Sequence, residues 1–62
     1  MIEITIENDW KFYFSYLEDV ARWLERRHHR EINIAEELES QITDINGCDF
    51  YINGKKYYYK QI

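Results

Sequence analysis

The dipeptide Asn53-Gly54 is the sequence feature that most constrains the fold of this chain. It separates two runs rich in strand-forming residues, CDFYI and KKYYYK. Asn-Gly between such runs strongly favours a β-hairpin closed by a two-residue type I′ turn, and a loop of this length fixes the register of the two strands. The predicted pairs are Ile52 with Lys55, Phe50 with Tyr57 and Cys48 with Tyr59.

Side chains alternate along a strand, so this register divides the hairpin into two faces. One face collects Cys48, Phe50, Ile52, Tyr57 and Tyr59, and the other Asp49, Tyr51, Lys56, Tyr58 and Lys60. The N-terminal segment MIEITIE alternates in the same way, with isoleucine at every second position, and predicts a strand with one buried face. If this strand lies beside the last one, Glu3 and Glu7 are positioned to face lysines, an arrangement that stabilises neighbouring strands.

The segment from Asp9 to Arg30 concentrates aromatic residues, and its spacing predicts a helix that ends near His29. Asn8 or Asp9 would cap the helix N-terminus. One apolar stripe of this helix would face the core, and a second stripe would lie beside it. We interpret the second stripe either as additional core or as a surface that meets another chain. The candidate interface residues are Phe12, Tyr16, Trp23 and Arg27.

A second helix is predicted to begin near Asn33, because Glu36 follows three residues later in a capping-box arrangement. Its apolar stripe would consist of Ile34, Leu38, Ile42 and Ile45. Asn46 and Gly47 would then end the helix in a left-handed conformation. An alternative interpretation makes residues 30–35 a short strand, since Ile32 and Ile34 alternate with polar neighbours.

These elements predict a single α+β domain over residues 1–62, in the order β-α-α-β-β, with two helices packed on a three-stranded sheet. The order of the strands stays open. A core of this size stabilises a fold only marginally, so an oligomeric partner would help. Cys48 has no second cysteine to bond within the chain and suits a reducing compartment. With no leader sequence and no long apolar run, a soluble cytoplasmic protein without membrane contact is expected.

The net charge of −4 is unevenly distributed along the chain. Four acids are predicted on the exposed side of the second helix, where they form either a solvated surface or a binding face for a basic partner: Glu36, Glu37, Glu39 and Asp44. An alternative nucleic-acid-binding footprint would comprise Arg22, Arg26, Arg30, Tyr51, Lys56 and Tyr58. The overall negative charge argues against that alternative, because phosphates repel an acidic protein.

Catalytic and cofactor motifs are not recognisable in this sequence. Gly47 and Gly54 are explained by turns and do not form a phosphate-binding loop. Glu25 and His29 have a spacing at which two ligands could share a metal ion, but a zinc site needs three or four protein ligands. We therefore expect a non-enzymatic protein that uses no cofactor or metal.

In size, acidity and abundance of Ile, Tyr, Asn and Glu, with the acidic run EINIAEELESQITDINGCD, the chain resembles small proteins encoded by phages and other mobile elements. Many of these are inhibitors of host defence, including anti-CRISPR and anti-restriction proteins. The resemblance implies a non-enzymatic inhibitor that binds a host protein in the bacterial cytoplasm. A homodimer is expected from the second aromatic stripe. The alternative is a small nucleic-acid-binding regulator.

Overall fold

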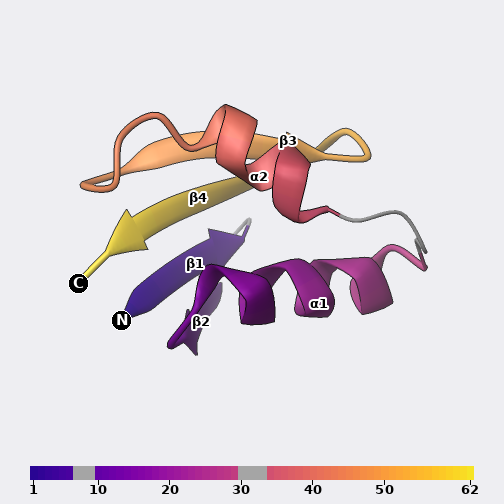
Figure 1. Cartoon of the computed structure of the whole chain (residues 1–62), viewed down its shortest axis with the longest axis horizontal. Helices are drawn as coiled ribbons and strands as arrows, with labels where there is room; N and C mark the ends of the chain where they lie inside the picture. Colours follow the sequence, from indigo (N-terminus) through magenta and orange to yellow (C-terminus); the bar gives the residue numbers. More distant parts are fainter. Residues whose placement is uncertain (7–9, 30–33) are drawn as a thin grey trace.

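A computed structural model describes residues 1–6, 10–29 and 34–62 (Figure 1). Its elements follow the order β1 (Ile2–Ile6), β2 (Trp10–Phe14), α1 (Leu17–Arg27), α2 (Ala35–Gln41), β3 (Cys48–Ile52) and β4 (Lys55–Gln61). The strands form one sheet in the order β2-β1-β4-β3, and every neighbouring pair is antiparallel. The predicted α+β class is confirmed, but the sheet has four strands where three were predicted.

Both helices lie on the same face of this sheet, with α1 over the β1–β2 side and α2 over β3 (Figure 1). This arrangement follows from the strand residues, which are buried at every second position in β1, β3 and β4. The buried core therefore forms one layer between helices and sheet. It consists of Ile2, Ile4, Val20, Ala21, Leu24, Ile34, Leu38, Phe50, Ile52, Tyr57 and Tyr59.

The C-terminal hairpin has the predicted turn and the predicted register. Phe50 pairs with Tyr57, and the two flanking pairs agree as well. Asn53 and Gly54 have positive φ angles of 51° and 79°, which are the left-handed conformations that a type I′ turn requires at both central positions. Because the register is correct, the predicted division into a buried and an exposed face is also confirmed.

The first strand lies beside the last, as one sequence interpretation anticipated. β1 and β4 are antiparallel neighbours, and Glu3 is opposite Lys60. The alternating isoleucines place Ile2 and Ile4 in the core. The predicted role of Glu7 lies outside the described residues. Pairing of β1 with β4 brings the two ends of the chain together, where the Met1 amine donates to the Ile62 carbonyl oxygen at 3.0 Å.

The aromatic segment is not one helix, and this prediction was wrong. Residues Trp10–Phe14 form the edge strand β2, and α1 begins only at Leu17. In WKFYF, large apolar rings at Trp10, Phe12 and Phe14 recur with the period of a strand, and aromatic residues fit a pleated surface well. The predicted helix cap at residues 8 and 9 therefore does not begin α1, and the local structure there lies outside the described residues.

Helix α1 buries the positions that recur every three to four residues. Val20, Ala21 and Leu24 are buried, and Leu17 packs partly against the same core. This helix was predicted to end near His29, and the observed end lies within two residues of that position, since α1 ends at Arg27 with His28 as its C-cap. The chain then reverses through His29, whose φ angle is 52°.

Helix α2 is shorter than predicted. It spans Ala35–Gln41, and the backbone N–H of Ile34 donates to the Glu25 carboxylate of α1 at 3.0 Å. A carboxylate near a helix N-terminus interacts favourably with the helix dipole, so α1 supplies the negative charge at this end. The predicted cap at Asn33 and most of the alternative strand over 30–35 lie outside the described residues.

The segment after α2 forms a turn in place of the predicted last helical turn. The Asp44 carboxylate accepts a hydrogen bond from the Asn46 N–H at 2.9 Å, a local bond that competes with helix formation. Gly47, with a φ angle of 150°, leads into β3 and does not end a helix. Ile45 is accordingly exposed and is not part of the apolar stripe.

Gln41 occupies the outer edge of β3 with its side-chain amide. Its Nε2 donates to the Tyr51 carbonyl oxygen and its Oε1 accepts from the Tyr51 N–H, each at 2.8 Å. The amide therefore makes the two bonds that a residue of a further strand would make. This edge of the sheet is partly closed by the chain itself.

Replacing Gly54 with Val should lower the free energy of unfolding by about 1–3 kcal/mol, because a β-branched residue resists positive φ. A Cβ atom at this position would have no heavy atom within 4 Å, so the cost comes from the backbone and not from a clash. Thermal or urea unfolding measures it. The control Lys55→Val adds the same side chain at an exposed strand position and should have a much smaller effect; equal losses would contradict the turn.

Replacing Gln41 with Ala should lower the free energy of unfolding by about 1 kcal/mol, because the Tyr51 backbone groups lose both partners. Hydrogen exchange should accelerate selectively at the Tyr51 amide. Gln61→Ala, which removes an exposed amide side chain from β4, serves as the control. An unchanged exchange rate at Tyr51 would show that the Gln41 contact does not protect this edge.

Candidate functional site

The face of the sheet opposite the helices gathers charged, hydroxyl and aromatic side chains from all four strands. We call it the open face. The strand registers place its residues side by side across all four strands. They are Glu3, Thr5, Lys11, Tyr13, Asp49, Tyr51, Lys56, Tyr58 and Lys60.

Three tyrosines dominate the open face, one from each of β2, β3 and β4. Tyr13 is 52% exposed, Tyr51 is 53% exposed and Tyr58 is 39% exposed. Tyr58 is the least exposed of the three, and its hydroxyl end lies next to Gly47, where an added Cβ atom would contact it. Glycine at this position therefore leaves room for the hydroxyl end of Tyr58 beside the residue that precedes β3.

The charges of the open face are largely compensated. The Lys56 ammonium is 3.6 Å from the Asp49 carboxylate, and Lys60 is opposite Glu3 in the neighbouring strand. Lys11 is opposite the neutral Thr5. The described part of this face is therefore amphipathic and nearly neutral, with one excess positive charge.

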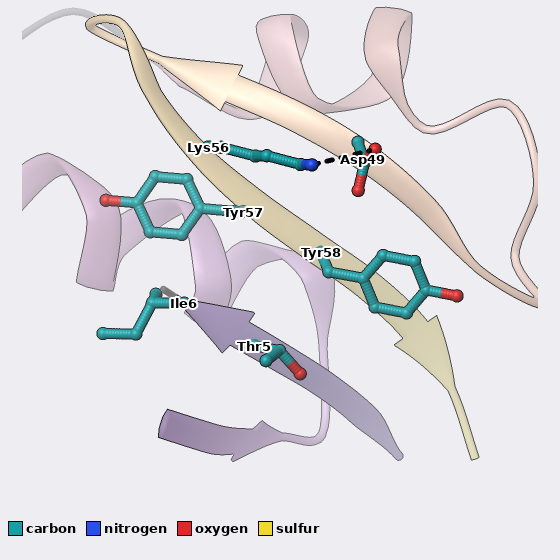
Figure 2. A pocket seen from close by; sticks show the side chains of 6 residues that line it. All are labelled: Thr5, Ile6, Asp49, Lys56, Tyr57 and Tyr58. Atoms are coloured by element: carbon teal, nitrogen blue, oxygen red, sulfur yellow. Dashed lines mark ion pairs between the residues drawn. The ribbon is translucent and has the colours of Figure 1, made fainter. Parts of the chain in front are cut away.

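A hollow of about 250 Å³ lies on this face between β1, β4 and β3. Figure 2 shows Thr5, Tyr58, Lys56 and Asp49 along it, with the Lys56–Asp49 ion pair spanning the two strands of the hairpin. Ile6 and Tyr57 also line it, and their side chains point away from these four (Figure 2). The hollow thus offers the Thr5 hydroxyl, the Tyr58 phenol and the Lys56–Asp49 ion pair to a ligand.

The predicted interface residues are only partly brought together. Trp23 of α1 packs against Phe12 with a ring-centroid distance of 4.9 Å, and the Arg27 guanidinium lies 5.5 Å from the Trp23 ring centroid. Trp23 also contacts Phe14 and Tyr57, which joins it to the core. Tyr16 precedes α1 and is 70% exposed. Whether these residues bind another chain stays a prediction.

The predicted acidic face is present in part on α2. Glu36 and Glu39 are exposed, while Glu37 is half-buried. Asp44 is exposed too, but its carboxylate is engaged in the turn described above. The exposed carboxylates lie on the helical side of the molecule, away from the open face.

The alternative nucleic-acid footprint is split between the two sides of the sheet. Tyr51, Lys56 and Tyr58 lie on the open face, whereas the exposed Arg22 and Arg26 belong to α1, which covers the opposite face. The Arg22 guanidinium forms an ion pair with Asp19 of the same helix. Arg30 lies outside the described residues. One continuous surface therefore does not include both groups.

The titratable groups of the described residues include one part-buried pair, in which His28 Nε2 and the Tyr57 hydroxyl oxygen are 2.6 Å apart. The described residues contain no group of three or more metal-ligating side chains that could hold an ion. Burial, with a smaller contribution from the neighbouring Cys48, raises the pKa of the Tyr59 hydroxyl above its ordinary value, so this phenol stays neutral. Cys48 itself is a half-buried free thiol packed against the core. No helix in the described parts of the chain is long and apolar enough to cross a membrane.

Comparison with known proteins gives no relative: no family model, no curated protein and no solved structure matches this chain. The functional argument therefore starts from the open face and the edges of the sheet.

Sequence reasoning found most of this site, including the five hairpin residues Asp49, Tyr51, Lys56, Tyr58 and Lys60. Tyr51, Lys56 and Tyr58 were predicted to share a face, but Lys11 and Tyr13 were assigned to a helix. The missed signal was the alternation in WKFYF, which places Lys11 and Tyr13 together on one side of a strand.

Replacing Trp23 with Ala should lower the free energy of unfolding by about 3 kcal/mol, because the indole packs against three aromatic rings. Arg27→Ala removes only the cation–π contact and should cost about 0.5–1 kcal/mol. Urea unfolding monitored by circular dichroism measures both. A Trp23→Ala variant as stable as the wild type would contradict the packing of this cluster.

Proposed function

We propose that this protein is a non-enzymatic binding module that recognises another protein through its open face. The observation that carries the proposal is the presence of three exposed tyrosines, one each on β2, β4 and β3, on the face of the sheet that the helices leave uncovered. Tyrosine is among the residues that contribute most to binding energy in protein interfaces, since it combines a large apolar ring with a polar tip.

The charge pattern favours a protein partner over a nucleic acid. Binding to a phosphate backbone depends on clustered cationic groups that release counterions. Here Lys56 is paired with Asp49, Lys60 is opposite Glu3, and the chain as a whole carries a charge of −4. A nearly neutral, tyrosine-rich surface suits a polypeptide better.

The biological role that we propose is inhibition of a host protein by occupation of its surface. This role rests on the resemblance in size and composition to anti-defence proteins of phages and mobile elements, and the exposed tyrosines of the open face support it. A nucleic-acid-binding regulator is the second candidate, favoured by the stacking surfaces of Tyr13, Tyr51 and Tyr58.

Affinity capture from a bacterial lysate, followed by binding measurements with the purified partner, tests the proposal. The double variant Tyr51→Ala, Tyr58→Ala should weaken binding at least 30-fold, about 2 kcal/mol, as expected for hot-spot tyrosines. The matched control is Glu36→Gln, Glu39→Gln, which alters the exposed acids of α2. The control should retain both its fold and its affinity.

Two results would contradict this assignment. Loss of binding in the Glu36, Glu39 variant alone would move the contact to α2. Retention of single-stranded DNA or RNA that falls steeply between 50 and 200 mM salt, and is lost in the tyrosine variant, would make the open face a nucleic-acid site.

A further inference from the structure

The two edges of the sheet differ in how far the chain closes them. At the β3 edge, the Gln41 amide holds both backbone groups of Tyr51. At the β2 edge, the described residues pair with β1 alone, so the outward N–H and C=O groups have no protein partner there. β2 is regular through its five residues and contains one charged side chain, Lys11.

The exposed side chains of β2 make this edge apolar as well as unpaired. Trp10 is 66% exposed on the helical side, and Tyr13 is exposed on the open face. The Phe12–Trp23 pair lies beside the same edge on the helical side. An unpaired strand of this composition is a template for pairing with a further strand.

The sequence of β2 is self-complementary when two copies pair antiparallel about Phe12. In that register each Trp10 is opposite Phe14 of the other copy, and each Lys11 is opposite Tyr13. The pairs are aromatic with aromatic and cation with aromatic, both of which stabilise adjacent strands. No charge faces a like charge.

Neighbouring symmetric registers are less favourable. Pairing about Lys11 places two ammonium groups opposite each other, which is destabilising. Pairing about Tyr13 brings Trp10 opposite Tyr16, which lies beyond the end of the strand. Only the register centred on Phe12 uses every residue of β2.

We infer that the β2 edge is the surface through which two copies of this chain associate, forming a continuous eight-stranded antiparallel sheet with a two-fold axis at Phe12. Such an interface is isologous, so it closes with two copies. The coverage of the β3 edge by Gln41 limits further growth from the outer strands of this dimer. The inference is independent of the proposed function, because it concerns a sheet edge and a second copy of the same chain.

A charge-reversal experiment tests this register. Tyr13→Lys puts a lysine opposite Lys11 of the other copy twice per dimer, so the dissociation constant measured by sedimentation equilibrium should rise about tenfold or more. Within its own sheet the new lysine is opposite Glu3, so the fold should be retained, as circular dichroism would verify. Adding Lys11→Glu to this variant should restore association, because each lysine then faces a glutamate.

The matched control is Tyr51→Glu at the other edge. Tyr51 has nearly the same exposure as Tyr13, and the new glutamate is opposite Lys56 of its own sheet. This variant should dimerise like the wild type. Hydrogen exchange at residues 10–14 should also slow as protein concentration rises, since dimer formation protects β2 amides.

Several outcomes would overturn the inference. A wild type that sediments as a monomer up to 500 µM has no such interface. Equal weakening by Tyr13→Lys and Tyr51→Glu would place the contact elsewhere. Failure of Lys11→Glu to restore association, with the fold intact, would exclude the register centred on Phe12.

Discussion

The pairing of β1 with β4 is the interaction on which the rest of the structure depends. It joins a strand at one end of the chain to a strand at the other, with Ile2 opposite Gln61. Without it, the chain would consist of two separate hairpins, and an isolated hairpin is marginally stable at best in water. The pairing creates a sheet wide enough to hold two helices, and its buried residues Ile4 and Tyr59 lie opposite each other in the core. Loop closure over such a distance is costly, which makes this contact the most demanding step in forming the fold.

How far the sequence predicted this structure depends on whether the signal was local. The Asn53-Gly54 turn sets its own φ angles, so the hairpin, its register and its two faces were predicted correctly. The helix predicted for the aromatic segment was wrong at its N-terminal end. Apolar residues at nearly every position there fit both the helical period of 3.6 and the strand period of 2, and we chose the helical period over the alternation of Trp10, Phe12 and Phe14. The capping of α2 by Glu25 could not be predicted, since it depends on the packing of one helix beside another. The same holds for Gln41, whose role exists only once β3 lies next to α2.

Because both helices pack on one face of the sheet, the side chains of the open face remain accessible to solvent. The chain described here builds one apolar layer and leaves the opposite side of the sheet to solvent, so residues there are not constrained by packing in a core. Polar and charged side chains would suffice to keep such a surface soluble, yet it carries Tyr13, Tyr51 and Tyr58. The hydroxyl end of Tyr58 lies next to Gly47, so a side chain at position 47 would require this ring to move. Large exposed rings on an otherwise polar face are the feature from which we propose a binding role.

The two outer strands of the sheet, β2 and β3, differ in how their free edges are shielded. A small protein with a sheet must satisfy or shield the backbone groups of both outer strands, and among the described residues a side-chain amide does so at the β3 edge. The unshielded edge is also where Trp10 and Tyr13 are exposed on opposite sides of a single strand. Pairing of two such edges would cover apolar surface and satisfy backbone groups at the same time, and both gains matter most in a domain whose own core is small. It would also place the open faces of the two copies on the same side of one continuous sheet. The two copies would then associate through β2, while the open-face residues of β4 and β3 would stay available to another protein.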